Sequence, residues 1–310
     1  MTTRQKLEII QKMLGLTQTR LAEKFGVSFV AFNGWWTGKS NPRRKKEIAI
    51  DELFLDVTGQ KIIPEDHLAA KKQALRQKLL RYKSVIDEIL KNPDIRDRFI
   101  LKLTYNSNSI EGSTLTEPDT AAILFDNAAL PNKSLTEHLE AKNHQTALNY
   151  LFEKIASKEK INEEFILKLH GILMNGIRPD AGRYRDHAVR IVGVNLPTAN
   201  YLSIPKLMPK IIFKAASRNK DMVSLSANIH AEFERIHPFS DGNGRVGRLL
   251  MNAMLLKANF APAIIHQEQK RLYYTYLYKA QSKNDNSQLE DFLCDSVVDG
   301  FKILERADIK

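Results

Sequence analysis

The chain has 310 residues, of which 43% are hydrophobic and 27% are charged, and its formal net charge is +11. This composition excludes a disordered, collagen-like or low-complexity protein, and at about 150 residues per domain the length predicts two domains, or one large domain with an appendage. A single cysteine, Cys294, excludes an internal disulfide framework and a cysteine-based zinc cluster. The excess of positive charge indicates a polyanionic partner: a nucleotide, a nucleic acid or an acidic membrane surface.

The apolar stretches are too short to cross a membrane. The densest, residues 249–256, contains Asn252, whereas a membrane span needs about 20 residues. No uninterrupted apolar run follows Met1, so no signal peptide is predicted. We therefore expect a soluble, cytoplasmic protein without a membrane partner.

Residues 1–60 predict a small helical domain. Apolar residues at 3/4 spacing indicate a helix over 4–14. Thr17 can cap a second helix that Gly26 stops, and Ser28 can open a third that runs to about residue 36. A basic run over 39–46 ends this domain.

The rest of the chain predicts further helices. We expect them near 46–56, 66–91, 94–111, 135–156, 163–176, 205–218, 222–235, 243–258, 269–281 and 287–306. The lysine- and arginine-rich helix 66–91 is interpreted as a spacer with a solvated face. The one extended piece is 188–204, whose β-prone residues and central turn predict a hairpin. The expected fold class is all-α with one β-hairpin.

The stretch 237–248 predicts an anion site. Gly242 and Gly244 leave the backbone bare, so several N–H groups can converge on an oxyanion. Apolar residues indicate that a buried helix begins at about Asn243, which adds the positive end of a helix dipole at the same point.

Four side chains complete this phosphate cradle. Arg245 and Arg248 are three residues apart, so both can reach one phosphate group. Asp241 is a lone carboxylate suited to Mg²⁺ between phosphates, and His237 has a pKa suited to proton abstraction. These groups indicate phosphoryl or nucleotidyl transfer. A Walker A loop is excluded because no Gly-Lys-Ser/Thr is present.

This stretch resembles the signature of the Fic family, His-x-Phe-x-Asp/Glu-Gly-Asn-Gly-Arg-x-x-Arg, at every specified position. The resemblance extends over roughly residues 95–300 and implies transfer of AMP from ATP to a Ser, Thr or Tyr hydroxyl of a target protein. It implies that His237 is the base and that Asp241 holds Mg²⁺. It also implies that the phosphates of ATP are bound by Gly242, Asn243, Gly244, Arg245 and Arg248, with Arg248 on the γ-phosphate.

Two further segments resemble parts of the same family. The 188–204 hairpin is similar to the flap that clamps the target peptide by strand addition, which implies a role for Val189, Ile191, Val192, Gly193 and Val194. Tyr273 and Tyr274 resemble the aromatic pair near the adenine pocket, although core packing accounts for them equally well. His230 is interpreted as a packed or hydrogen-bonded residue.

The last acidic residue of the helix predicted over 94–112 lies at an electrostatically unfavourable position. Ser107 and Glu111 share one face, and Gly112 is placed as a C-terminal stop. Glu111 lies at the negative end of the helix dipole and therefore needs a cationic partner. The segment resembles the Fic inhibitory motif, Ser/Thr-x-x-x-Glu-Gly/Asn. This implies that Glu111 pairs with Arg248 and blocks productive binding of the γ-phosphate. In some relatives the equivalent glutamate also supports removal of AMP, so the sequence leaves the direction of the reaction open.

Residues 5–48 resemble a helix-turn-helix of the Cro/repressor type. The resemblance implies DNA contacts within 17–46, with phosphates near Arg43, Arg44, Lys45 and Lys46. Base-facing positions would be Ser28, Phe29, Asn33 and Trp36. Gly34 and Trp36 depart from the usual pattern, and a protein-docking or dimerising module is the alternative.

We therefore divide the chain into a helix-turn-helix domain (1–60), a helical linker (61–93), an inhibitory helix (94–112) and a catalytic domain (113–310) with its core at about 163–300. The expected function is autoinhibited AMPylation with ATP and Mg²⁺. A DNA-binding regulator with a silenced or ligand-sensing Fic domain remains an alternative, as do de-AMPylation of the same target and transfer of another group such as phosphate or phosphocholine. A homodimer is also left open.

Overall fold

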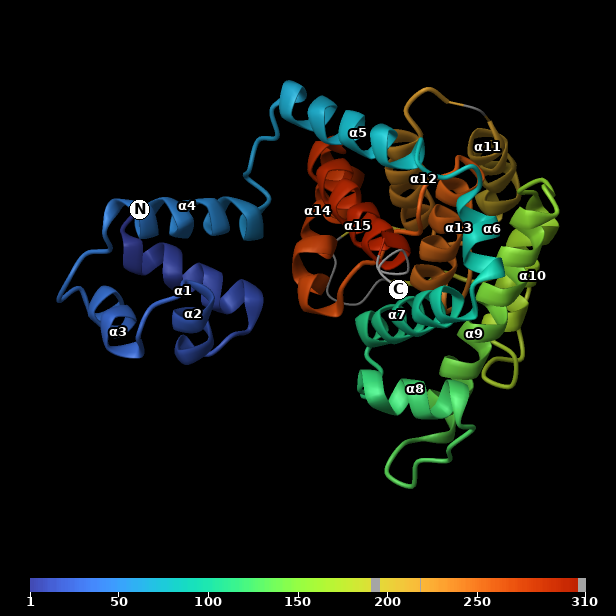
Figure 1. Ribbon diagram of the computed structural model, residues 1–310, viewed down its shortest axis with the longest axis horizontal. Coiled ribbons are helices and arrows are strands. Elements are labelled where there is room, and N and C mark those ends of the chain that lie inside the picture. The colour runs from blue at the N-terminus through green and yellow to red at the C-terminus, as the bar shows by residue number, and fades with distance from the viewer. Residues whose placement is uncertain (191–195, 218, 306–310) are drawn as a thin grey trace.

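The computed structural model describes residues 1–190, 196–217 and 219–305, and within these ranges it contains helices and no strand. Figure 1 shows helices α1–α4 as a small group beside a larger helical body. Each group has its own buried hydrophobic cluster. No helix in the described part of the chain is both long and apolar enough to cross a bilayer.

The N-terminal group comprises α1 (Thr3–Leu14), α2 (Gln18–Lys24), α3 (Phe29–Thr37) and α4 (Arg44–Thr58). The side chains expected to cap two of these helices do so: Thr17 Oγ1 accepts from the N–H of Arg20, and Ser28 Oγ accepts from the N–H of Ala31. The core of this group is formed by Leu7, Ile10, Leu21, Ala22, Phe25, Phe32, Trp35, Ile50, Phe54 and Val57.

The larger body begins at α5 (Glu65–Leu79). It continues with α6 (Val85–Lys91), α7 (Pro93–Glu111), α8 (Glu117–Phe125), α9 (Leu135–Ala156), α10 (Glu163–Leu173), α11 (Ile204–Ala216), α12 (Met222–Ile236), α13 (Asn243–Lys257), α14 (Lys270–Lys283) and α15 (Ser287–Glu305). Short 3₁₀ turns lie at Tyr201–Ser203 and Gln267–Gln269.

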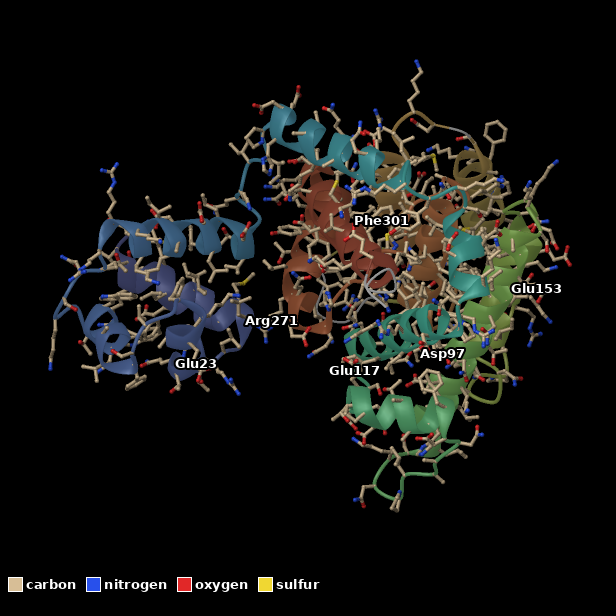
Figure 2. The ribbon with its side chains drawn as sticks, viewed as in Figure 1. Glu23, Asp97, Glu117, Glu153, Arg271 and Phe301 are labelled. Carbon is tan, nitrogen blue, oxygen red and sulfur yellow. The ribbon has the colours of Figure 1, made fainter. Side chains whose placement is uncertain are left out.

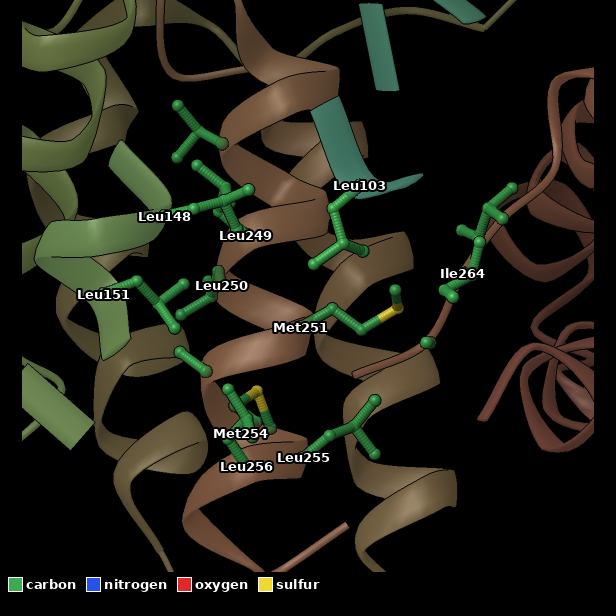
Figure 3. Close-up of a cluster of buried hydrophobic side chains, with 14 of the residues drawn as sticks. Leu103, Leu148, Leu151, Leu249, Leu250, Met251, Met254, Leu255, Leu256 and Ile264 are labelled. Carbon is green, nitrogen blue, oxygen red and sulfur yellow. The ribbon is translucent and has the colours of Figure 1, made fainter. Parts of the chain in front are cut away.

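Helix α13 lies at the centre of this body. Nearly all of its residues are buried, which is typical of a helix surrounded by others. In Figure 3 its leucines and methionines face Leu148 and Leu151 of α9 on one side and Leu103 of α7 on another. This packing fixes the N-terminus of α13, where the anion site is predicted.

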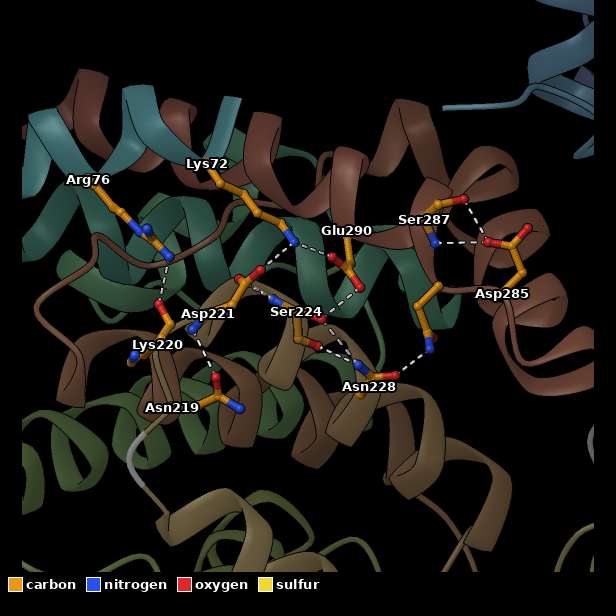
Figure 4. Close-up of polar contacts among 11 residues, drawn as sticks. Lys72, Arg76, Asn219, Lys220, Asp221, Ser224, Asn228, Asp285, Ser287 and Glu290 are labelled. Atoms are coloured by element: carbon orange, nitrogen blue, oxygen red, sulfur yellow. Dashed lines mark hydrogen bonds and ion pairs between the residues drawn. The ribbon is translucent and has the colours of Figure 1, made fainter. Parts of the chain in front are cut away.

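The spacer predicted over 66–91 is wrong in two respects. It is two helices, α5 and α6, because Ser84 caps a new helix through the N–H of Asp87. Its basic side chains are also not merely solvated. Figure 4 shows Lys72 of α5 between Asp221, at 2.6 Å, and Glu290 of α15. Helix α5 is therefore packed onto the body by ion pairs.

Helix α8 was missed from the sequence. A capping box starts it: Thr116 Oγ1 accepts from the N–H of Asp119, and the Asp119 carboxylate accepts from the N–H of Thr116. The Thr-x-x-Asp spacing was the available signal.

The hairpin expected over 188–204 is not confirmed. In the described residues of this range, 188–190 and 196–200 form no strand, and α11 begins at Ile204. Ile191, Val192, Gly193 and Val194 lie outside the described residues, so of the expected flap residues only Val189 is described. Its carbonyl accepts a hydrogen bond from Thr198 Oγ1 at 2.9 Å.

The N-terminal group also contacts the body through side chains of α14. Arg271, labelled at this junction in Figure 2, donates to the carbonyl of Lys12 at 2.9 Å. Tyr276 Oη donates to Asp56 at 3.2 Å. Leu272 packs against the core of the N-terminal group. Helix α14 of the body thus provides these contacts to the N-terminal group.

Candidate active site

His237 ends α12 and has the geometry of a base. Its ring Nδ1 lies 3.2 Å from the carbonyl oxygen of Glu234. Because a carbonyl only accepts hydrogen bonds, Nδ1 carries the proton and Nε2 keeps a free lone pair. Burial lowers the pKa of His237, so the ring is neutral and able to accept a proton at pH 7.

A neutral carboxyl lies beside this histidine. Burial raises the pKa of Glu234 to about 8, so at neutral pH its side chain is protonated. The 4.0 Å approach of Glu234 Oε2 to His237 Nδ1 is therefore not an ion pair. It leaves the histidine neutral.

The loop from Phe239 to Asn243 is closed by one side chain. Asn243 Oδ1 accepts from the N–H of Phe239 at 2.9 Å, and its Nδ2 donates to the Phe239 carbonyl at 2.8 Å. The phosphate-binding role expected of Asn243 therefore cannot come from its side chain. Its main-chain N–H still lies in the first turn of α13, where N–H groups have no partner within the helix.

His170 of α10, which no sequence pattern indicated, supports this loop. His170 Nδ1 accepts from the N–H of Gly182 at 2.9 Å, so the proton is on Nε2, which donates to the carbonyl of Asp241 at 3.2 Å. The ring stacks on Phe239 with centroids 3.8 Å apart. Burial lowers the pKa of His170 to about 4, so it supports the loop as a neutral ring.

Arg245 points toward α9 and pairs with a second residue that was missed. Its Nη1 lies 2.7 Å from Glu140 Oε1, and its Nη2 lies 3.9 Å from Asp241. Arg245 is only 3% exposed. Glu140 therefore fixes the direction of a buried guanidinium at the N-terminus of α13.

Arg248 points toward α7, one turn further along. Its Nε donates to Ser107 Oγ and its Nη2 to the Ser107 carbonyl, both at 3.0 Å. Nη2 also lies 2.6 Å from Glu111 Oε1. Burial works against the charged form, but Glu111 and the nearby tyrosines outweigh it and raise the pKa of Arg248. The guanidinium stays charged.

The Glu111 carboxylate lies against the first turn of α13. A Cβ at position 244 would collide with this carboxylate and approach Arg248, so the absence of a side chain at Gly244 makes the contact possible. Gly112 follows with φ 112° and ends α7. An acid of the chain itself thus lies where a helix N-terminus attracts anions.

The two tyrosines differ. Tyr273 is fully buried, and its hydroxyl lies 2.6 Å from His230 Nε2, so in this conformation it cannot line an adenine pocket. This corrects the expected binding role of Tyr273, and it identifies His230 as a hydrogen-bonded core residue. Tyr274 is half-buried and close enough to Arg248 to feel its charge.

Asp241 is the accessible carboxylate of the site. Its side chain is 55% exposed, and Oδ1 accepts from the N–H of Gly242 at 2.6 Å. In the described ranges no group of three or more His, Cys, Asp or Glu side chains could hold a metal ion. One carboxylate beside a phosphate cradle fits Mg²⁺, which binds through one or two carboxylates and takes other ligands from phosphates and water.

Residues 160–255 match the Fic/DOC family. The matched range contains His170, His237 and both arginines of the cradle. Glu111 and Glu140 lie before it.

Curated relatives carry a Fic name. The chain is 37% identical over 181 residues to "Protein adenylyltransferase Fic" of Nematostella vectensis, covering 57% of this chain and 42% of that protein. It is 33% identical over 195 residues to the protein of the same name in Drosophila virilis, covering 62% and 40%. The chain thus spans about two fifths of the length of these relatives.

Solved structures share the fold. A Fic domain containing signaling protein from Bacteroides thetaiotaomicron aligns with a TM-score of 0.68 and 25% identity, covering 77% of this chain and 98% of that one. Fic-1 from C. elegans, with a TM-score of 0.68 and 21% identity, covers 94% and 85% and supports the fold alone.

Proposed function

We propose that this protein transfers AMP from ATP to a hydroxyl side chain of a target protein. The observation that carries the proposal is the placement of a neutral histidine, with Nε2 available, beside a helix N-terminus flanked by two buried arginines. The names of the curated relatives support the same reaction class.

In the proposed reaction, Nε2 of His237 takes the proton of the target hydroxyl. The hydroxyl oxygen bonds to the α-phosphorus of ATP, the bond from that phosphorus to the bridging oxygen breaks, and pyrophosphate leaves. The N–H groups at the start of α13, Arg245 and Arg248 neutralise phosphate charge. Mg²⁺, held through Asp241, would supply additional positive charge to the phosphates.

We further propose that Glu111 keeps the enzyme inactive. Its carboxylate takes one of the donors of Arg248 and lies over the first turn of α13. A γ-phosphate bound to Arg248 would meet this negative charge at close range. Release of Glu111 is therefore required for productive binding of ATP.

The test uses ATP labelled at the α or the γ position with the Glu111→Gly variant and a cell lysate. The proposal predicts α-label on protein, none with His237→Ala, and no γ-label. Transfer of the γ-label would instead indicate a kinase, and absence of both labels from protein would contradict the proposal. To settle the direction, AMP-modified protein is returned to the wild-type enzyme, and release of AMP would reveal de-AMPylation.

A second candidate function, DNA binding, rests on the N-terminal group. Phe29 and Asn33 are exposed at the start and middle of α3, and exposed Arg43, Arg44 and Lys45 lie near the start of α4. Such an arrangement places apolar and amide groups for base contacts and cations for phosphates.

Two of the side chains expected to contact DNA, Lys46 and Trp36, are partly buried and contact other residues of the small domain. Lys46 donates to the main-chain carbonyl of Phe25, and Trp36 stacks on Phe32 with centroids 6.1 Å apart. Both contacts stabilise the small domain.

Fluorescence anisotropy with mixed-sequence duplex DNA tests this candidate. Arg43→Ala/Arg44→Ala should weaken binding and flatten its dependence on salt, because two phosphate contacts are lost. Lys158→Ala/Lys160→Ala, on the exposed surface of the body, is the control. Equal losses in both variants would mean that only net charge matters.

A further inference from the structure

Arg185 is buried next to the candidate base His237, and its guanidinium is surrounded by main-chain carbonyl groups. Its Nε donates to the carbonyl of His237 at 2.7 Å, and Nη2 donates to the carbonyl of Ile236 at 3.3 Å. Its other bonds reach the carbonyls of His187 and Ala199, both at 2.6 Å. One guanidinium thus joins the base to both ends of the segment that starts at His187 and ends at Ala199.

The positive charge of Arg185 is not neutralised by an acidic side chain. Arg185 is 4% exposed, and in the described part of the chain it forms no ion pair with an acidic side chain. A buried charge without an acidic partner is costly. The guanidinium presents five N–H donors in a fixed plane, and here that plane is used to hold several carbonyl groups at once.

The two carbonyls nearest the base belong to the peptides on either side of His237. His237 has φ 53° and ψ 62°, the left-handed conformation that side chains other than glycine seldom adopt. The main-chain N–H of Arg185 also donates to the carbonyl of Pro238 at 3.0 Å. Three consecutive carbonyls, of residues 236, 237 and 238, are therefore held by one residue.

We propose that Arg185 is a positioning residue, which holds the His237 backbone in its left-handed conformation and ties the base to the His187 and Ala199 ends of the neighbouring segment. This inference rests on the proposed function of His237. Arg185 does not touch the phosphate cradle, whose contacts are made by α7, α9 and α13. Its loss therefore affects the base and leaves ATP binding intact.

The charge of Arg185 gives the proposal a second signature. The charged and titratable groups that face His237 are Glu234 on its own helix, Arg185, Glu111 and Asp241. Arg185 acts to lower the pKa of His237, in the same direction as burial. Because the base must be neutral, loss of this positive charge should move the acid limb of the pH–rate profile to higher pH.

The experiment compares Arg185→Met, Arg185→Lys and, as control, Arg183→Met in the Glu111→Gly protein. Arg183 is exposed two residues away. Arg185→Met should lower kcat for AMP transfer about 100-fold, the cost of misplacing a reacting group, with the Kd for ATP changed less than about threefold. Arg185→Lys should restore the original acid limb because it keeps the positive charge. It should restore only part of kcat because lysine lacks the planar set of N–H donors that holds several carbonyls. Arg183→Met should match the parent.

A kcat for Arg185→Met close to the parent value, or a loss of ATP affinity in proportion to kcat, would overturn the proposal. NMR of ¹³C-labelled histidine separates this failure from failure of the proposed function, since it needs no turnover. The His237 resonance should shift and titrate at higher pH in Arg185→Met but keep its pKa in Arg185→Lys. An unchanged resonance and pKa in Arg185→Met would refute the positioning role even if no AMP transfer is ever detected.

Discussion

The two arginines of α13 lie one turn apart and are each paired with a glutamate from a different helix, yet the pairs are built differently. Arg245 meets Glu140 of α9 through one nitrogen, while Arg248 is held by Glu111 and by two oxygens of Ser107 of α7. Both guanidiniums are buried. The same type of ion pair thus occurs on two sides of one cradle.

What separates the pairs is where the acid lies. Glu140 is in the second turn of α9, beyond which the helix continues to Ala156. Glu111 is the last residue of α7, and its carboxylate reaches over Gly244 into the first turn of α13. We infer that the Arg245 pair orients a phosphate-binding group, whereas the Arg248 pair occupies the place of the phosphate.

The largest effect that separates the pairs is expected from Glu111→Gly. A hydrogen bond between charged groups contributes about 1.5–3 kcal/mol, so removing this competitor should raise AMP transfer by about 10- to 100-fold. Incorporation of α-labelled ATP into protein measures the change. Unchanged incorporation, with His237→Ala still inactive, would show that Glu111 does not inhibit AMP transfer.

Glu140→Gln should act in the opposite direction. The substitution keeps the size of the side chain but removes the near carboxylate of the buried Arg245, which then has only the longer 3.9 Å approach to Asp241. We expect kcat/KM for ATP to fall about tenfold. Steady-state kinetics in the Glu111→Gly background measures it, with Glu153→Gln, on an exposed part of α9, as control. A rise in activity would mean that Glu140 is also inhibitory, and the two arginine–glutamate pairs would then not differ in role.

The residue pattern itself predicted the local parts of this arrangement, whereas the distant Glu111–Arg248 pair was implied only by the family resemblance. The caps at Thr17 and Ser28, the start of α13 at Asn243 and the end of α7 at Gly112 all depend on residues close in the chain. Their chemistry is visible in the local pattern.

Glu140, His170 and Arg185 could not be found in this way. Each acts on a residue 52 to 105 positions away, through contacts that only the packing of α9, α10 and α12 against α13 creates. In the sequence, a glutamate, a histidine and an arginine in amphipathic surroundings look like ordinary surface residues. Only the fold buries His170 and Arg185 and partly buries Glu140. Tyr273 is the reverse case. Its ring was expected near the adenine pocket, but packing buries it fully in the core.

Ser107→Ala sharpens the comparison on the Arg248 side with a smaller effect. The variant removes the acceptor of Arg248 Nε but keeps the main-chain acceptor and Glu111. A loss of about 0.5–1.5 kcal/mol in the inhibited state should raise AMP transfer about two- to tenfold. The same labelled-ATP assay applies, with Ser109→Ala as control. A decrease would mean that Ser107 prepares Arg248 for phosphate.

The smallest effect concerns the link between the two sides. Glu137, one turn before Glu140 on α9, accepts from the N–H and hydroxyl of Thr114, just after the end of α7, and from Ser134. These bonds lower its pKa from 4.5 to about 2. The folded pKa is depressed, so the stability that Glu137 contributes is complete above about pH 4.5 and is lost as the pH falls toward 2.

The difference in unfolding free energy between the wild type and Glu137→Gln should therefore be largest at pH 7 and shrink steadily from pH 4.5 to pH 3. Denaturant titrations at each pH measure it. Because Glu137 ties the chain beyond Glu111 to the helix that carries Glu140, Glu137→Gln should also loosen the Glu111 side and raise AMP transfer slightly. A difference that stays constant with pH would mean that the Thr114 contact does not depend on the carboxylate charge, and α9 would then support only the Arg245 side of the cradle.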